Sequence, residues 1–240
     1  MTEKLSNEYD RIKEISNNLN ILRAQIKIAA IKSGRNERDI ALVAVTKTMS
    51  AQDIKIAFAC GVTIIGENRV QELLIKLPQL DMTGRRADII GHLQTNKVKS
   101  IIDKVTFIQS VDSLKLAQTI DSEAYKIGII ADVLCEINIG GEDTKAGVSP
   151  DALPKLLEGI EKMRSIRVSG LMAIPPISTE KEKSRYYFKQ MYKLFIDIGS
   201  KKTDNINMNI LSMGMSSDFD IAIEEGSNMV RVGTAIFGKR

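Results

Sequence analysis

The sequence predicts a single α/β domain, a (β/α)8 TIM barrel preceded by an extra N-terminal helix. Three observations support this class. Eight short runs rich in Val, Ile and Leu occur along the chain, longer amphipathic stretches separate them, and the 240 residues suit one barrel of about 250 residues. The 43% hydrophobic and 27% charged residues are typical of a globular protein.

The first expected element is a long helix near the N-terminus. Apolar residues recur at helical spacing over residues 3–33, and Gly34 follows as a stop signal. We therefore divide the single domain, residues 1–240, into a leading helix at 1–34 and a barrel at 41–238.

Eight runs after this helix are interpreted as strands. They show little alternation of polar and apolar residues, as expected for parallel strands that are buried on both faces. Successive runs are far enough apart to include a crossover helix. A doubly wound open sheet is the alternative, because the runs predict the number of strands better than the closure of the sheet. The runs are 41–46, 62–65, 88–91, 105–109, 131–138, 166–172, 208–213 and 229–233.

Composition and local patterns argue against several functional classes. No segment reaches the roughly 18 apolar residues of a membrane span, and the N-terminus lacks the pattern of a secretory signal, so a cytoplasmic protein without a membrane partner is expected. The net charge of +4 is spread over mixed-sign stretches, which argues against nucleic acid binding. Cys60 and Cys135 lie in apolar runs without metal-ligand spacing, so buried free thiols and no bound metal are expected.

Lys47 is the first candidate functional residue. In a barrel of this kind the active site lies at the C-terminal ends of the strands, and Lys47 directly follows the run 41–46. A partly desolvated amine there is a better nucleophile for a carbonyl, as Schiff-base formation requires. Position alone favours a solvated loop lysine, because the chain has 34 basic residues.

The loops after the seventh and eighth runs change this balance, because such loops form the usual phosphate site of these barrels. Residues 211–218, LSMGMSSD, supply hydroxyl groups, a glycine and the start of a helix. Gly233 allows close approach of a ligand, and Thr234 adds a donor. Together with Lys47, these loops suggest a phosphorylated carbonyl ligand, and pyridoxal 5'-phosphate (PLP) satisfies both requirements.

Arg231 bears on the chemistry of such a ligand. It alternates with Val230 and Val232, so it points into the barrel if these valines pack outward against helices. An arginine facing the pyridine nitrogen of PLP would keep that nitrogen unprotonated and weaken the ring as an electron sink. The alternative is a structural salt bridge, with Glu67 or Asp220 as the partner.

Other polar side chains also stand at the ends of predicted strands. Asn68 is better placed than Glu67 to meet the cofactor, because an amide donates as well as accepts hydrogen bonds. His92 is the only histidine, and we expect it to orient the mouth or cap a strand end instead of acting as a base. The other members of this set are Gln94, Ser110, Asn138 and Ser212.

Eight segments carry a resemblance to a known family. Taken in order, they are LVAVTKT at 42–48, GENRVQE at 66–72, IGHLQTNK at 90–97, SVDSLKLA at 110–117, GEDTKAGV at 141–148, GLMAIP at 170–175, LSMGMSSDFDIAI at 211–223 and MVRVGTAIFG at 229–238. The chain resembles the pyridoxal phosphate homeostasis protein family, the single-domain relatives of the alanine racemase barrel. One departure is Met49-Ser50, where many relatives have a proline shortly after the lysine.

The resemblance implies a PLP-binding protein in which Lys47 holds the cofactor as a Schiff base. The family is regarded as maintaining the supply of PLP without established turnover, so no catalytic residue is expected. The other implied contacts are Asn68 beside the ring, Arg231 at the pyridine nitrogen, and Ser212, Gly233 and Thr234 at the phosphate.

Three functions follow from these observations as alternatives. The first is a monomeric PLP carrier or buffer that supports intracellular vitamin B6 and amino-acid homeostasis, with PLP-dependent apoenzymes as candidate recipients. The second is a PLP-dependent amino-acid racemase of low activity. Racemases of this type take a second base, a tyrosine, from a C-terminal domain, whereas this chain ends at Arg240 and its five tyrosines fall in predicted helices. The third is a lysine-dependent aldolase that needs no cofactor. We expect the first.

Overall fold

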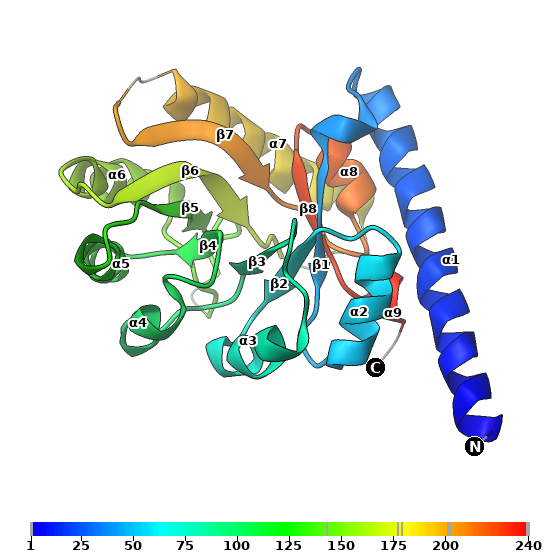
Figure 1. Cartoon of the computed structure of the whole chain (residues 1–240). Coiled ribbons are helices and arrows are strands. Elements are labelled where there is room, and N and C mark those ends of the chain that lie inside the picture. The colour runs from blue at the N-terminus through cyan, green and yellow to red at the C-terminus, as the bar shows by residue number, and fades with distance from the viewer. Residues whose placement is uncertain (1, 143, 177, 179, 201–202, 239–240) are drawn as a thin grey trace.

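The computed structural model describes residues 2–142, 144–176, 178, 180–200 and 203–238, with side chains described from residue 8 onward. Its eight parallel strands form a closed barrel in chain order (Figure 1). The last strand, β8, pairs with β1 and places Arg231 beside Val43, which closes the sheet. The predicted (β/α)8 barrel is confirmed, and the open-sheet alternative is excluded.

Each strand lies within two residues of its predicted position. β2 and β4 begin and end two residues later than expected, whereas β3 begins and ends two residues earlier. Glu67 and Ser110 therefore lie inside their strands, where both are buried. The strands are β1 (Ala41–Val45), β2 (Ile64–Glu67), β3 (Arg86–Ile89), β4 (Phe107–Val111), β5 (Ala131–Ile137), β6 (Ile166–Ala173), β7 (Ile206–Ser212) and β8 (Met229–Val232).

Helices alternate with the strands and cover the outside of the barrel (Figure 1). The predicted leading helix is present as α1, which packs against α2, α8 and α9. The helices are α1 (Thr2–Lys32), α2 (Ala51–Ala59), α3 (Val70–Lys76), α4 (Val98–Ile101), α5 (Leu114–Lys126), α6 (Leu153–Glu161), α7 (Lys181–Gly199), α8 (Phe219–Glu224) and α9 (Thr234–Phe237). Short 3-10 helices cover Glu37–Asp39, Leu77–Gln79, Thr95–Lys97 and Pro150–Ala152.

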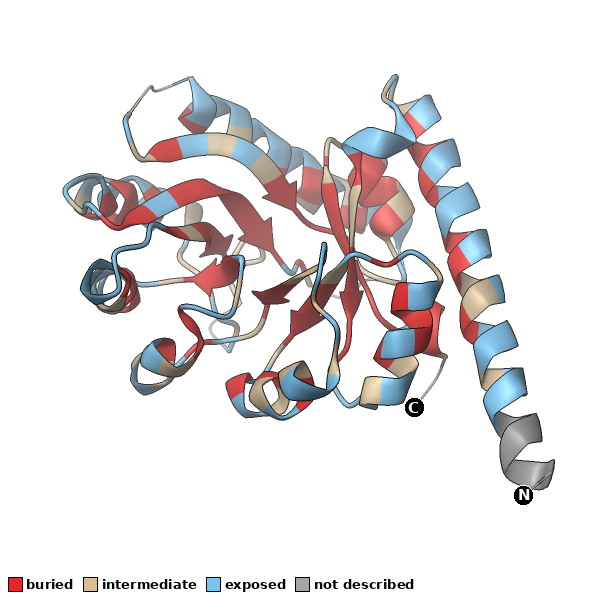
Figure 2. Ribbon diagram, in the orientation of Figure 1, coloured by how far each residue is buried: buried red, intermediate tan, exposed pale blue. Residues whose placement is uncertain are grey.

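The buried apolar side chains form one layer outside the sheet and a small separate cluster. The layer lies between the strands and the helices, and it includes Leu19 of α1 together with Ala44 and Val230 of the strands. A smaller cluster, formed by Phe107, Leu134 and Met172, is separate from this layer. Figure 2 shows strands that are mostly buried, with exposed residues on β7, and helices that are buried mainly on the side facing the strands. Successive strand residues therefore alternate between the outer layer and the barrel interior.

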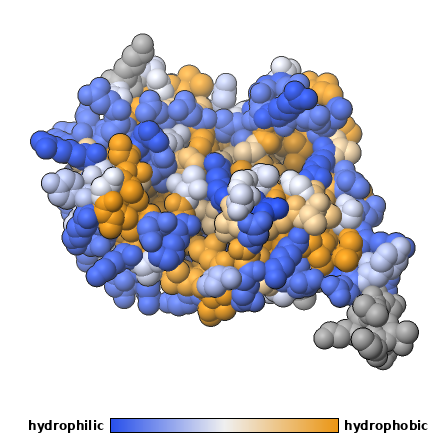
Figure 3. Space-filling view, in the orientation of Figure 1, coloured by the Kyte–Doolittle hydropathy of each residue, from blue (hydrophilic) through white to orange (hydrophobic). Residues whose placement is uncertain are grey.

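None of the described helices combines the length and the apolar character needed to cross a membrane. On the face in Figure 3, hydrophilic side chains predominate and hydrophobic ones form smaller patches between them.

The two cysteines are both free thiols but differ in burial. Cys135 on β5 is buried, and burial raises the pKa of its thiol to about 12. Cys60 is only half-buried, because it follows the last residue of α2, where the chain leaves the core. The predicted buried thiol is confirmed for Cys135 and wrong for Cys60.

Candidate functional site

The alternation of side chains along β7 and β8 directs two predicted site residues into the barrel. Leu211 of β7 and the valines Val230 and Val232 of β8 pack in the outer layer. Ser212 and Arg231 therefore point to the interior, as the sequence predicted for Arg231.

Lys47 occupies a tight turn at the C-terminal end of β1. Val45 faces away from the outer layer, and Lys47, two residues later in the turn, is half-buried. The Met49 N–H donates to the Thr46 carbonyl at 2.9 Å and closes the turn, with Thr48 at a φ of 64°. The turn thus fixes the backbone of Lys47 at the mouth, the end of the barrel formed by the C-terminal ends of the strands.

Glu67 lies on the other face of the sheet and points toward α3. Its Oε1 accepts hydrogen bonds from Thr46 Oγ1 and Lys76 Nζ, each at 2.7 Å. Burial raises the pKa of this carboxyl group, although the hydrogen bond from Lys76 acts in the opposite direction. The expected position of Glu67 at the mouth is wrong, because Glu67 shares the outward direction of Ile65 in the same strand.

A buried line of polar side chains crosses the barrel from β8 to β3. Arg231 donates through Nη1 to Ser212 Oγ at 2.6 Å and through Nη2 to the Ala173 carbonyl at 2.8 Å. Ser212 Oγ donates to Gln109 Oε1 at 2.8 Å, and Gln109 Nε2 donates to Asp88 Oδ2 at 2.8 Å. Within the part of the chain that the structure describes, Arg231 forms hydrogen bonds in place of the salt bridge considered as the alternative.

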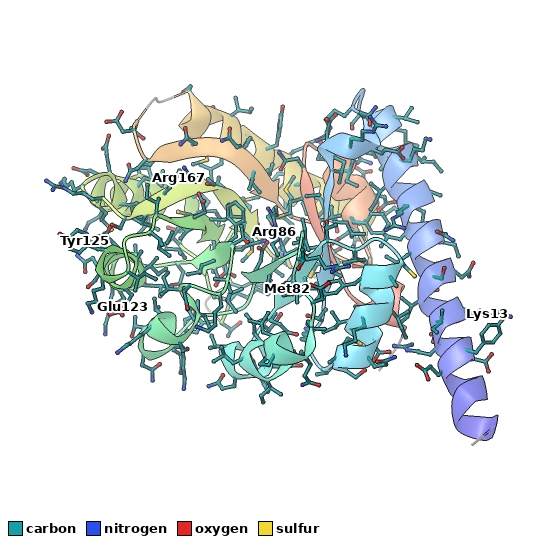
Figure 4. All side chains as sticks on the ribbon, in the orientation of Figure 1. Lys13, Met82, Arg86, Glu123, Tyr125 and Arg167 are labelled. Carbon is teal, nitrogen blue, oxygen red and sulfur yellow. The ribbon has the colours of Figure 1, made fainter. Side chains whose placement is uncertain are left out.

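Burial shifts the pKa values of the ionisable side chains in and near this line of polar residues. It lowers the pKa of Arg231 to about 10, with Glu136 and Asp218 acting in the opposite direction, so the guanidinium stays protonated at neutral pH. It raises the pKa of Asp88 to about 6 and that of Glu136 to about 7. Arg86, labelled in Figure 4, lies with Nε 3.6 Å from Asp88 Oδ1. The interior therefore contains a protonated Arg231 and two carboxyl groups, Asp88 and Glu136, whose pKa values lie near neutrality.

The loop after β7 reaches the start of α9. Ser216 Oγ accepts hydrogen bonds from the backbone N–H groups of Gly233 and Ala235, both at 3.3 Å. Gly233 packs against β1, since a Cβ atom there would lie 3.3 Å from Val45 O. Thr234, the first residue of α9, is exposed. Two backbone donors therefore converge on one oxygen atom close to the end of β1.

Asn68 and His92 lie just beyond β2 and β3. Asn68 is half-buried and so close to Gly91 that a Cβ atom at Gly91 would lie 2.7 Å from Asn68 O. Ser110 Oγ donates to the Gly91 carbonyl at 2.7 Å. The side chain of His92 is 62% exposed, with Nδ1 3.5 Å from Asp112 Oδ2. Gly91 is thus held between Asn68 and Ser110, whereas His92 lies at the surface.

Sequence reasoning missed three residues of this site. Ser216 belongs to the predicted phosphate loop, but nothing local indicates that its hydroxyl group meets Gly233. Gln109 and Glu136 are polar residues inside apolar strands, and this was the available signal, because buried polar groups in a strand require partners inside the barrel. Asn138, expected at the mouth, instead holds its own loop by donating to the Glu142 carbonyl at 2.8 Å.

Comparisons with known proteins agree with this architecture. A family model described as alanine racemase, N-terminal domain, matches residues 15–240. The chain is 42% identical to the pyridoxal phosphate homeostasis protein of Aquifex aeolicus, over 90% of this chain and 94% of the relative. It is 30% identical to the solved structure of PipY from Synechococcus elongatus with PLP bound, with a TM-score of 0.82, over 93% of this chain and 100% of PipY.

A more distant structure shares the fold. The alanine racemase of Clostridium difficile is 21% identical with a TM-score of 0.71, and the match covers 95% of this chain but 57% of the racemase. The resemblance found in the sequence is therefore confirmed by the family model, by relatives that match along most of their length and by the barrel itself. The chain belongs to the pyridoxal phosphate homeostasis protein family, whose barrel is that of the alanine racemase N-terminal domain.

Proposed function

We propose that this protein binds PLP through Lys47 and carries or buffers the cofactor, thereby supporting intracellular vitamin B6 and amino-acid homeostasis. The single observation that carries the proposal is the half-buried Lys47 just after β1, the strand whose residue Val45 lies against Gly233. The N–H groups of Gly233 and Ala235 converge on Ser216 Oγ at the same end of the barrel. The relatives' names and the PLP bound to PipY support the same function.

The donor set at the mouth fits a phosphorylated pyridine aldehyde. A phosphate oxygen is a stronger acceptor than the Ser216 hydroxyl group that the N–H groups of Gly233 and Ala235 now meet. Thr234 supplies a further hydroxyl group, and Ser212, whose proton now goes to Gln109 Oε1, would turn to donate to the phosphate, so we assign the phosphate to this side of the mouth. When bound, PLP supplies an aldehyde that condenses with an amine and a ring that withdraws electrons.

Arg231 and Asn68 are assigned to the ring. A guanidinium that stays protonated at neutral pH would donate to the pyridine nitrogen of bound PLP and so keep that nitrogen unprotonated. Asn68, half-buried after β2, would lie beside the ring and donate from its amide. An unprotonated ring nitrogen weakens electron withdrawal, which suits a protein that holds the cofactor more than one that turns over substrate.

The remaining parts of the proposal concern the whole chain. We assign residues 1–240 to one PLP-binding domain with a leading helix at 1–34 and a barrel at 41–238. We further propose that the protein is a cytoplasmic monomer that passes PLP to PLP-dependent apoenzymes.

Trapping of the bound cofactor tests the attachment site. Purified protein mixed with PLP should absorb visible light, and borohydride reduction should leave PLP on the peptide that contains Lys47. The variant Lys47→Ala should lose this adduct, whereas Lys97→Ala, which removes a lysine from the 3-10 helix after β3, should keep it. PLP found on a different lysine in the mass spectrum would contradict the assignment.

A racemase assay separates the carrier from the alternative function. We expect PLP-loaded protein to racemise amino acids far more slowly than an average enzyme, because Arg231 weakens the ring as an electron sink. The measurement is the loss of optical rotation or the appearance of the D-enantiomer for a panel of amino acids. A turnover number near the enzyme median of roughly 10 per second would overturn the carrier proposal.

A further inference from the structure

The turn that carries Lys47 has an unusual backbone. Thr48 is the only described residue other than glycine with a positive φ, 64°, and a β-branched residue there is an outlier. Lys47 and Thr48 are the central residues of the turn closed by the Met49 N–H and the Thr46 carbonyl. A positive φ at the second central residue is the pattern of a type II turn, which favours glycine. Other contacts must hold this conformation.

Two side chains of α3 hold both sides of Lys47. Lys76 Nζ donates to the carbonyl of Thr46, the residue before it, at 2.7 Å. The carboxylate of Glu72 accepts a hydrogen bond from the backbone N–H of Thr48, the residue after it. Glu72 and Lys76 are also paired with each other at 2.6 Å, one helical turn apart. Both peptide groups that flank Lys47 are thus tied to the same face of one helix.

Each of the three N–H donors of the Lys76 ammonium group has a hydrogen-bond acceptor. Its three donors meet the Thr46 carbonyl, Glu72 Oε1 and Glu67 Oε1, and its side chain is 8% exposed. Burial tends to raise the pKa of Glu72, but the hydrogen bonds from Lys76 and from the Thr48 N–H outweigh it and lower the pKa. Glu72 therefore remains an anionic acceptor for the Thr48 N–H at neutral pH.

We infer that Glu72 and Lys76, supported by Glu67, act as a positioning device that holds the strained turn and so aims the Lys47 amine at its carbonyl ligand. The inference rests on the proposed function, because it explains how the amine is placed for PLP. Neither α3 residue would touch the cofactor, so both are positioning residues. The strain at Thr48 follows from this arrangement, since the hydrogen bond to Glu72 selects a conformation that threonine avoids.

A rescue experiment tests the device. Glu72→Ala should raise the dissociation constant for PLP about tenfold, equivalent to about 1.4 kcal/mol, and speed hydrogen exchange in the peptide that covers residues 46–49. Adding Thr48→Gly to Glu72→Ala should restore binding to within about threefold of wild type, because glycine adopts a positive φ without strain. The matched control is Glu123→Ala, which removes an ion pair with Lys126 on α5 and should change neither readout (Figure 4).

The outcomes distinguish this inference from the proposed function. If wild-type protein forms no adduct on Lys47, the proposed function fails, and hydrogen exchange alone then decides whether Glu72 holds the turn. If wild type forms the adduct and Glu72→Ala matches Glu123→Ala in binding and exchange, only the positioning role is overturned. A loss of binding in Glu72→Ala that Thr48→Gly leaves uncorrected also overturns it.

Discussion

Glu136 is a buried carboxyl group whose surroundings favour its neutral form. It lies on β5 and is 7% exposed. Burial raises its pKa to about 7 and the charge of Asp112 acts in the same direction, whereas Arg231 and His92 act against them. The folded protein therefore binds a proton at Glu136 in a pH range in which the unfolded chain, with a pKa near 4.5, has released it.

This difference in proton binding predicts how stability depends on pH. The stabilising contribution of Glu136 to the free energy of unfolding is fully present below pH 4.5. It falls as the pH rises toward about 7 and does not change further above that value. The loss should reach about 3 kcal/mol at most, at about 1.4 kcal/mol per pH unit. Glu136→Gln, which cannot ionise, should lack this decline, and urea unfolding of the PLP-free protein at pH 5 and pH 8 measures it. Parallel stability curves for wild type and Glu136→Gln would contradict the prediction.

The directions of individual side chains could be predicted from the sequence only where they depend on a local pattern. The inward direction of Arg231 followed from its alternation with valines, a local property of an extended strand. The outward direction of Glu67 was missed, because its partners Thr46 and Lys76 come from β1 and α3. The pairing of Ser216 with Gly233 was missed for the same reason, since it joins two separate loops.

At the scale of the element, α1 links the N-terminal region to the end of the barrel. Ile15, Leu19 and Ile26 on its inner face are buried in the outer layer. Its polar residues also contact α9: Asn18 Nδ2 donates to the Ile236 carbonyl at 3.0 Å, and Arg11 Nη1 donates to the Phe237 carbonyl at 3.0 Å. α1 therefore helps to hold α9, the helix that starts at the predicted phosphate loop.

Two substitutions on α1 should show that its buried face contributes more to the free energy of unfolding than its exposed face. Leu19→Ala should lower the free energy of unfolding by about 2–5 kcal/mol, because it leaves a cavity at a fully buried position. Ile28→Ala, at a position that is 56% exposed on the same helix, should change it by no more than about 0.5 kcal/mol. Urea unfolding monitored by circular dichroism measures both. Equal effects of the two substitutions would mean that the packing of α1 on the barrel contributes little to stability.

At the scale of the whole molecule, closure of the barrel assembles the candidate site. β1 and β8 are neighbours, so Lys47 near the start of the chain and Gly233 near its end lie at the same end of the barrel. Val45 packs against Gly233 across this seam. An open sheet with the same eight strands would separate these residues, so the geometry proposed for PLP depends on closure.

The sequence by itself determined the number, order and approximate bounds of the strands, the leading helix and the identity of the lysine and arginine at the strand ends. These features depend on spacing along one segment, where periodicity and chain direction are enough to predict them. The tertiary structure alone decided that the barrel closes and that Gln109 meets Ser212, 103 positions later. It also brought Lys76 to the Thr46 carbonyl across 30 positions. Such contacts depend on strand register and helix packing between distant segments, and no local pattern of residues encodes them.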